Sequence, residues 1–260
     1  MLPHEYRTMF AAEDQHWWYH ALRFWLEKML TRYVSPGARI LDAGCGTGAT
    51  LAFLRTRGYE AIGIELAAKA LRLAAERPAV RGRLCGASVD LLPVASTSFD
   101  AAVCLDVLYL LSDEQEAITL AELRRVLKPG GILIVHLPAF EWLRGEHDQA
   151  VATQRRYTAT SLRRLLTAAG FEVLRLEYRY WLFLPAVWVV RRLWRYGQRE
   201  KAMATSDLTL SFGFANSLLT LAAEAEDWIG QWTPRPWGSS VCAVAITPPS
   251  VRVRCPAVHR

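Results

Sequence analysis

The order of apolar and polar positions along the chain predicts short strands that alternate with amphipathic helices. Apolar runs bounded by turn residues predict strands over residues 39–42, 61–65, 83–86, 99–105, 132–137 and 171–177. Apolar residues at helical spacing predict helices over residues 47–57, 67–77, 113–127 and 158–169. Ser112 is placed to cap the third of these helices, and Gly170 follows the fourth. Such an alternation is typical of an α/β fold with a parallel sheet and right-handed crossovers.

Two further segments flank this alternating region. Residues 14–33 carry apolar side chains at helical spacing and predict an N-terminal helix. Residues 178–232 read as a helical insertion that opens with an aromatic-rich run. That run is shorter than the ~20 apolar residues a bilayer requires, and Pro185 interrupts it. We expect the insertion to form a cap over the active site or a homodimer interface, with peripheral membrane contact through residues 178–196 as the alternative.

The composition argues against several classes of protein but does not identify the function. The 260 residues are 52% hydrophobic and 22% charged, which favours one globular domain. The net charge is +6, but the arginines are scattered among acids, so no nucleic-acid partner is expected. The five cysteines form no metal-binding pattern with each other or with histidines, and no metal is expected. The first residues lack a signal sequence, which predicts a cytoplasmic location, with the inner membrane surface as the alternative.

The strongest functional signal is the segment 40–48, Ile-Leu-Asp-Ala-Gly-Cys-Gly-Thr-Gly. An apolar strand runs into a glycine-rich turn and then a helix, which suits the binding of a nucleotide-type cofactor. The spacing Gly44-x-Gly46-x-x-Ala49 also satisfies the relaxed dinucleotide fingerprint, so an NAD-type site is one interpretation. Asp42 favours a second interpretation, a cofactor that carries an ammonium group. A carboxylate at this position would crowd a pyrophosphate but could accept a hydrogen bond from an ammonium group. The run Lys128-Pro129-Gly130-Gly131, which precedes a further apolar strand, adds to the second interpretation.

With these motifs the chain resembles the class I S-adenosylmethionine-dependent methyltransferases over roughly residues 38 to 140. The resemblance implies a doubly wound, seven-stranded Rossmann-like sheet whose last strand, here Ser240 to Thr247, is antiparallel. It also implies a single methyltransferase domain with five consecutive parts. These are an N-terminal helical lid (1–36), a cofactor-binding core (37–177), a helical cap (178–235), the last strand (236–248) and a tail (249–260).

The resemblance assigns the cofactor contacts residue by residue. The methionyl portion is expected at Gly44, Gly46 and Gly48, and its ammonium group at Asp42. The ribose hydroxyls are expected at Glu65, and the adenine face at Leu66. This sequence departs from the family at the adenine amino group, because Ser88 stands where an acid is usual. The contacts expected beyond the ribose are Ser88, Val89 as a backbone donor, and Asp106 at the carboxyl edge of the sheet. The assignment of Ser88 can shift by one residue.

The sequence predicts fewer residues for acceptor binding than for cofactor binding. Methyl transfer is an in-line displacement that gains much of its rate from alignment, and a base is needed only where the acceptor must lose a proton. The candidate bases are His136, His147 with Asp148, Tyr19 and His16. Trp17 and Trp18 are either core anchors or a lid over the sulfonium.

A bacterial subgroup of the family has a similar E-D-x-H-W-W-F/Y opening, an H-D pair, an R-R-Y element and a closing P-W-G-S-S run. Residues 13–19, 147–148, 155–157 and 236–240 match these four features, and Arg23 is the surviving part of an arginine-rich continuation. We place Trp17, Trp18, Arg23 and Tyr109 on the substrate or lid side of the site.

These observations predict an S-adenosylmethionine-dependent methyltransferase that acts on a small or lipid-like apolar acceptor, with O-methylation favoured over nitrogen or carbon. Two alternatives remain open, an NAD-type Rossmann oxidoreductase and a non-catalytic domain that keeps the fold as a scaffold. The intact Asp42, glycine turn and Glu65 argue against the scaffold, because a degenerate site would be expected to lose them.

Overall fold

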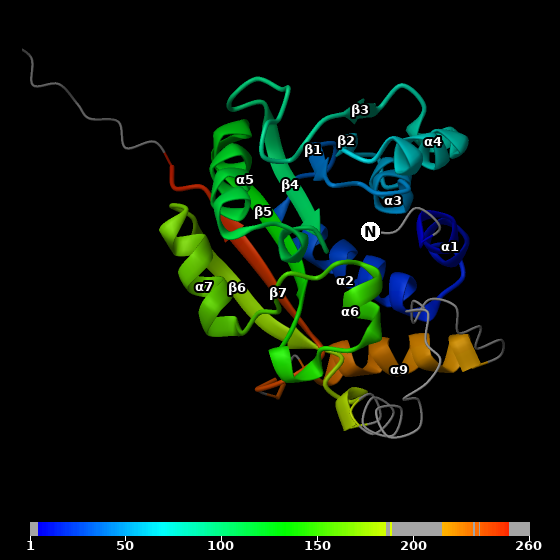
Figure 1. Ribbon diagram of the computed structural model, residues 1–260. Helices are drawn as coiled ribbons and strands as arrows, with labels where there is room; N and C mark the ends of the chain where they lie inside the picture. Colours follow the sequence, from blue (N-terminus) through cyan, green and yellow to red (C-terminus); the bar gives the residue numbers. More distant parts are fainter. Residues whose placement is uncertain (1–4, 186–187, 189–214, 231, 234, 250–260) are drawn as a thin grey trace, which may run out of the picture.

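The computed structural model describes residues 5–185, 188, 215–230, 232–233 and 235–249. Its centre is a seven-stranded sheet with the order β3-β2-β1-β4-β5-β7-β6, shown in Figure 1. Only β7 is antiparallel to its neighbours, which confirms the predicted Rossmann-like sheet with its antiparallel last strand. The strands are β1 (Arg39–Ala43), β2 (Glu60–Glu65), β3 (Leu84–Gly86), β4 (Phe99–Leu105), β5 (Leu127–Pro138), β6 (Glu172–Arg179) and β7 (Ser240–Ile246).

Helices cover both faces of this sheet. The described helices are α1 (Glu5–Ala12), α2 (Trp17–Tyr33), α3 (Ala49–Thr56), α4 (Ala68–Glu76), α5 (Asp113–Val126), α6 (Glu146–Ala150), α7 (Ala159–Ala168) and α9 (Ala215–Ile229). Short 3₁₀ turns are η1 (Pro78–Val80), η2 (Leu108–Leu110) and η3 (Glu141–Leu143). Side chains of α2 and α3 form one hydrophobic cluster with the sheet, and those of α5 and α7 form the other.

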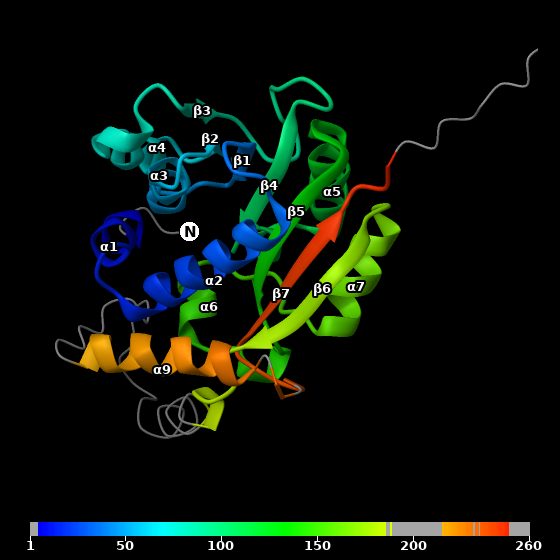
Figure 2. The same cartoon turned by 180° about the vertical axis from the view of Figure 1, so that it is seen from behind.

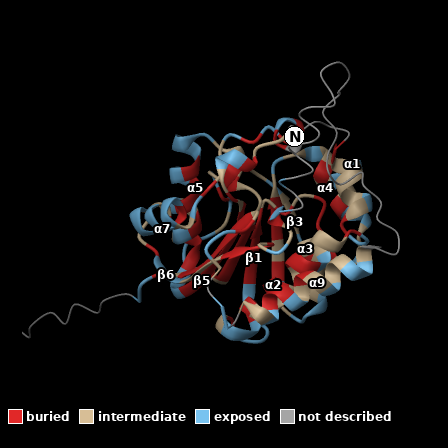
Figure 3. Ribbon diagram, turned by 90° about the horizontal axis from the view of Figure 1, so that it is seen from below, coloured by how far each residue is buried: buried red, intermediate tan, exposed pale blue. Residues whose placement is uncertain are grey.

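The two clusters follow from the alternation of side chains along each strand. Ile40, Val103 and Ile134 face α2 and α3, whereas their neighbours Leu41 and Leu133 face α5 and α7. Strands buried on both faces read as continuous apolar runs, as this sequence does. Figure 3 shows the strands as a buried centre and the outer helix faces as exposed.

Most predicted elements appear at or near their expected bounds. The strand at 99–105 is confirmed without a shift, and Ser112 forms a reciprocal capping box with Gln115 at the start of α5. β5 begins at Leu127 instead of residue 132, because Leu127 pairs with Phe99 before an irregularity in the β4–β5 register. The N-terminal helix begins at Trp17 instead of residue 14, because the extended backbone of His16 caps it. A separate helix, α1, was not predicted.

The predicted insertion is described only in part. Its first two residues continue β6, which ends at Arg179, so the insertion begins later than expected. Its helix α9 lies along α2, as both Figure 1 and Figure 2 show. Residues 186–187 and 189–214, which include part of the segment 178–196 expected to contact a membrane surface, lie outside the described residues. Within the described part, no helix combines the length and apolar character that crossing a bilayer demands.

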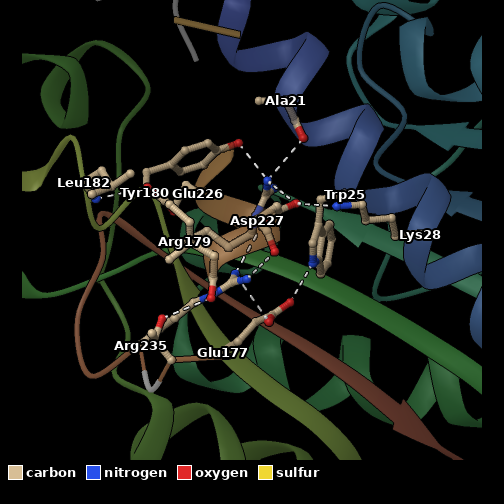
Figure 4. A network of polar contacts seen from close by, with 12 residues as sticks. Ala21, Trp25, Lys28, Glu177, Arg179, Tyr180, Leu182, Glu226, Asp227 and Arg235 are labelled. Atoms are coloured by element: carbon tan, nitrogen blue, oxygen red, sulfur yellow. Dashed lines mark hydrogen bonds and ion pairs between the residues drawn. The ribbon is translucent and has the colours of Figure 1, made fainter. Parts of the chain in front are cut away.

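A buried network of charges, here called the α9 anchor, joins α9 to the sheet (Figure 4). Arg179 at the end of β6 is 1% exposed, and its Nη2 lies 3.2 Å from Oδ2 of Asp227 on α9. Arg235 also donates to Asp227, over 3.3 Å. Nε1 of Trp25 on α2 donates to Glu177 on β6 over 2.8 Å. The anchor therefore fixes α9 and α2 on the same edge of the sheet.

Candidate functional site

The turn between β1 and α3 has the backbone that its glycines predict. Gly44 and Gly48 have φ of 79° and 83°, a region that other residues adopt only with strain. A Cβ added at Gly44 would collide with the side chain of Val107. The backbone N–H groups of Gly44 and Cys45 both donate to the carbonyl of Ile64 on β2, over 2.8 Å and 3.0 Å. The turn is therefore tied to the carboxyl end of the neighbouring strand, where α/β folds bind their ligands.

Asp42 lies directly before this turn and is only 2% exposed. Its Oδ2 is buried and has no hydrogen-bond partner among the described residues. Burial, together with the charges of Glu13 and Glu65, raises the pKa of Asp42 to about 8. A buried carboxylate oxygen without a partner is costly, so the arrangement fits a ligand that brings a cationic donor to this point.

Glu65 ends β2 and faces the same turn. One of its oxygens accepts from the N–H of Gly46 over 3.0 Å, and the other accepts from the N–H of Ala67 over 2.8 Å. These bonds fix the carboxylate in one orientation, while each oxygen keeps a lone pair for a further donor. The next side chain, Leu66, is 71% exposed and is free to cover a flat ligand.

The residues expected around the adenine lie after β3. Ser88 is half-buried, and its carbonyl accepts from the N–H of Leu91 over 3.2 Å. The side chain of Val89 is buried in the hydrophobic core, so only its backbone could serve a ligand. Their roles toward a ligand stay predictions.

The segment between α1 and α2 closes over the glycine turn. Four residues make this contact and are here called the N-terminal latch: Glu13 and Asp14 of the segment, Thr47 of the turn, and Arg77 after α4. Glu13 accepts a hydrogen bond from the hydroxyl of Thr47 and pairs with Arg77 over 2.9 Å. Arg77 also pairs with Asp14 over 2.9 Å and donates to the carbonyl of Thr47 over 2.9 Å. Burial raises the pKa of Glu13 to about 7, although Thr47 and Arg77 oppose this effect. Sequence reasoning assigned no role to Glu13 or Arg77, because their contact joins segments far apart in the chain.

Asp106 and His136 form a second polar pair, the dyad, at the carboxyl edge of β4 and β5. The strand register places His136 beside Leu105, the residue before Asp106. The two carboxylate oxygens of Asp106 lie 3.1 Å and 3.0 Å from Nδ1 of His136. Nε2 of His136 is buried and has no hydrogen-bond partner among the described residues. Asp106 was predicted as a cofactor contact, and this role stays a prediction beside its observed pairing with His136.

Aromatic rings surround the dyad. The ring of Trp18 meets the imidazole edge-on at 5.6 Å, and those of Trp25 and Tyr180 lie 6.4 Å and 6.5 Å away. Trp17 points elsewhere, because it stacks on Phe183 at 5.1 Å and meets Tyr180 edge-on. The two adjacent tryptophans therefore have different neighbours: Trp18 lies beside the dyad, and Trp17 packs against the insertion.

Burial shifts the pKa of three more predicted residues. It raises the pKa of Tyr19 and of Tyr109, and the charge of Asp106 adds to both effects. Arg23, one turn along α2 from Tyr19, has its pKa lowered by burial, while Asp14 and Glu13 oppose that effect. The roles of Tyr19, Arg23 and Tyr109 toward a substrate stay predictions.

The predicted His147–Asp148 pair has a different environment. Asp148 is buried and forms a two-pronged ion pair with Arg156, over 2.8 Å and 2.9 Å, and its Oδ2 accepts from the N–H of Gly145. This arrangement favours a structural role for Asp148 in holding α6. The neighbouring Arg155 pairs with Glu116 on α5, which also accepts from the hydroxyl of Tyr157. The R-R-Y element thus fastens this loop to the helical layer, and the side chain of His147 lies outside what the structure describes.

Within the described residues, no group of three or more histidine, cysteine or acidic side chains is arranged to hold a metal ion.

Comparison with known proteins identifies the family. A family model described as a methyltransferase domain matches residues 41–135. An uncharacterized methyltransferase of Synechocystis is 31% identical over 153 residues, which cover 55% of this chain and 70% of that protein. The chain belongs to the S-adenosylmethionine-dependent methyltransferases. The resemblance on which the sequence expectations depend is thereby confirmed.

Two further comparisons show more limited similarity of this methyltransferase-family chain to known proteins. The malonyl-acyl-carrier-protein O-methyltransferase of Serratia marcescens is 36% identical over 99 residues, and the chain spans only 38% of that protein's length. The phosphoethanolamine N-methyltransferase 2 of Haemonchus contortus, solved with S-adenosyl-L-methionine, superposes with a TM-score of 0.54 at 17% identity. That likeness covers 85% of this chain and 52% of the other, and it shows the fold alone.

Proposed function

We propose that this protein transfers a methyl group from S-adenosylmethionine to an oxygen of a small or lipid-like apolar acceptor. The observation that carries the proposal is the unpartnered Oδ2 of Asp42, buried directly before the glycine turn. This oxygen lacks a hydrogen-bond donor, and an ammonium group is a compact cationic donor that fits it. A pyrophosphate would instead bring negative charge to Asp42, Glu13 and Glu65, which argues against the NAD-type alternative.

The rest of the cofactor site fits the same group. The oriented carboxylate of Glu65 suits two neighbouring ribose hydroxyls, because each of its oxygens can accept one further hydrogen bond. The exposed Leu66 offers an apolar surface for the adenine. When bound, the cofactor supplies a methyl group on a positively charged sulfur. The glycine turn, Asp42 and Glu65 would hold its two ends, and the N-terminal latch would close over the turn.

The aromatic surroundings of the dyad support an apolar acceptor. Trp18, Tyr180 and Tyr109 are large side chains that bury a flat or hydrocarbon ligand well. Oxygen is favoured as the acceptor atom because a histidine–aspartate pair lies in these surroundings, and because the Serratia relative is an O-methyltransferase. Membrane contact and a homodimer remain expectations from the sequence alone.

Isothermal titration calorimetry tests the cofactor assignment. S-adenosylhomocysteine and NADH are titrated separately into the purified protein. We expect S-adenosylhomocysteine to bind at one site per chain and NADH to show no binding heat. Asp100→Asn, which changes an exposed acid at the start of β4, serves as a control that should bind like the wild type. Binding of NADH without binding of S-adenosylhomocysteine would overturn the proposal.

A further inference from the structure

We infer that the Asp106–His136 dyad removes a proton from the acceptor, so that the acceptor is a neutral hydroxyl compound and not a carboxylate. This inference rests on the proposed function and names the substrate class of the same site. A carboxylate acceptor carries no proton to remove at neutral pH, so a base would be of no use to it.

The geometry of the dyad decides which imidazole nitrogen can act as the base. An ionised carboxylate only accepts hydrogen bonds, so Nδ1 must be the protonated nitrogen when it faces both oxygens of Asp106. Nε2 then carries the free lone pair. Because Nε2 is buried without a described partner, the pair leaves one unused acceptor inside the protein. An acceptor hydroxyl would supply the missing donor.

The backbone of Asp106 supports a functional role for this pair. Its φ of 57° lies in the left-handed region, which non-glycine residues adopt rarely. This conformation is fixed by the hydrogen bond from the N–H of Asp106 to the carbonyl of His136, over 2.9 Å. The carboxylate is therefore held over the imidazole by its own main chain.

The neighbouring polar groups do not serve Nε2. The indole N–H of Trp25 donates to Glu177, and the hydroxyl of Tyr180 accepts from Arg179. The titratable groups that face the dyad include Tyr19 on α2, Cys104 on β4, Tyr109 on η2, Tyr180 after β6 and Cys242 on β7. Burial raises the pKa of each of these groups, which keeps them neutral beside Asp106.

The charge of these surroundings disfavours a carboxylate acceptor. Arg156, which adjoins Tyr109, is held by Asp148, and Arg179, which adjoins Tyr180, is held by Asp227. A carboxylate ligand would therefore meet Asp106 while the adjoining arginines are engaged with other acids, whereas a neutral hydroxyl group on an apolar skeleton would not be repelled.

The proton transfer balances without a further reactant. The O–H bond of the acceptor breaks, a bond forms between Nε2 and the proton, and Asp106 stabilises the resulting imidazolium. The oxygen keeps the electron pair and forms the bond to the methyl carbon, while the sulfur takes the pair of the carbon–sulfur bond. His136 then returns the proton to solvent, so one proton is released for each methyl group transferred.

Nuclear magnetic resonance of nitrogen-15-labelled histidine tests the dyad independently of activity. The His136 signal is identified by its absence in His136→Gln. At about pH 8 we expect a neutral imidazole with its proton on Nδ1. Asp106→Asn should lose this fixed preference, because an amide can pair with either tautomer and asparagine tolerates positive φ. Asp100→Asn is the matched control. A wild-type imidazole protonated on Nε2, or on both nitrogens, at this pH overturns the inference.

The substrate class is tested with two probes of the same skeleton, 2-naphthol and 2-naphthoate, added to protein saturated with S-adenosylhomocysteine. We expect 2-naphthol to shift the Nε2 resonance of His136 and 2-naphthoate to leave it unchanged. No response to 2-naphthol, or a larger response to 2-naphthoate, contradicts the hydroxyl class. Failure of S-adenosylhomocysteine to bind in the calorimetric titration contradicts the proposed function itself, so the two failures are distinguishable.

Discussion

The α9 anchor and the glycine turn both bury acidic side chains, but they balance the charge in opposite ways. In the α9 anchor, Glu177 receives hydrogen bonds from Arg175 and Trp25, and these partners lower its pKa in spite of burial. At the glycine turn, Asp42 keeps an unpartnered oxygen and its pKa rises to about 8. Buried charges that are paired are compatible with a stable fold, whereas an unpaired one is maintained at a cost that a ligand can offset.

The two regions therefore differ in what their acids do. The acids of the α9 anchor join α2, β6 and α9, and removing one would leave arginines unpaired inside the protein. The free oxygen of Asp42, the acid at the glycine turn, forms no bond to another element. Removal of this carboxylate should weaken cofactor binding without lowering the stability of the fold. The predictions below test this difference, from the largest expected effect to the smallest.

The largest effect is expected for Asp227→Ala in the α9 anchor. Asp227 is 4% exposed and accepts from both Arg179 and Arg235. Its loss leaves the buried guanidinium group of Arg179 without this acid, while Arg235 keeps Glu177 at 3.5 Å. We expect the free energy of unfolding to fall by about 3–5 kcal/mol, measured by urea denaturation. Asp100→Ala breaks an exposed pair with Lys128 and an exposed hydrogen bond from the N–H of Arg39, and it should cost only about 1–2 kcal/mol. Equal losses in the two variants would remove the distinction between the regions.

Asp42→Asn should show the opposite profile. The change keeps the shape of the side chain and removes the charge, so the affinity for S-adenosylhomocysteine should fall by about 2–3 kcal/mol, roughly 30- to 150-fold. The free energy of unfolding without ligand should stay the same or rise, because above about pH 8 the variant no longer buries an unpaired charge. Calorimetry and urea denaturation on the same samples check both parts. A destabilised variant with unchanged affinity would make Asp42 a structural residue.

Asp42 should also make both binding and stability depend on pH. Its pKa is raised from 3.8 in the unfolded chain to about 8 in the fold, so the folded state holds its proton more tightly. The resulting stabilisation is complete below about pH 4 and is lost as the pH rises toward 8. Binding of an ammonium group requires the ionised form, so affinity should rise by about tenfold for each pH unit between 6 and 8.

This pH dependence is measured by titrating S-adenosylhomocysteine at several pH values. Asp42→Asn should flatten most of the dependence. Glu13, whose pKa of about 7 is raised in the same direction, is expected to leave a smaller residual slope. Affinity that falls as the pH rises over this range would contradict the assignment of the ammonium group to Asp42.

The smallest effect is expected for Glu65→Ala. The variant removes two hydrogen bonds to ribose and also leaves the N–H groups of Gly46 and Ala67 without their partner. We expect a loss of about 1.5 kcal/mol in affinity for S-adenosylhomocysteine, near tenfold, with the fold intact by circular dichroism. 5′-Methylthioadenosine, which keeps the ribose but lacks the amino acid end, should lose affinity equally. Unchanged affinity for both ligands would refute the ribose assignment.

Local sequence patterns predicted most of the sheet and the glycine turn. The strand at 99–105 and the cap at Ser112 depend on neighbouring residues only, so propensity and periodicity were sufficient. The helix α1 was missed because residues 5–12 show little apolar periodicity and the helix packs against α4. The early start of β5 was missed because Pro129 and Gly130 suggest a turn, while long-range pairing with β4 extends the strand.

The site was predictable where one segment defines it and not where several meet. Asp42 and Glu65 lie at strand ends beside a recognisable turn, and the structure places both facing that turn. The pairing of Asp106 with His136 depends on the register between β4 and β5, which no local pattern specifies. The ion pair between Asp148 and Arg156 and the contact between Glu13 and Arg77 likewise arise from loop conformations that only the complete fold defines.

The position of β7 between β5 and β6 has a consequence for how the chain is made. Among the described strands, β6 pairs only with β7, so its edge stays open until residues 240–246 have been synthesised and inserted. An open strand edge can pair with another chain, which makes a partly synthesised molecule prone to aggregation. A nascent chain should therefore complete its sheet late, after residue 246 has emerged from the ribosome, and shortened forms that lack β7 should depend on chaperones to remain in solution.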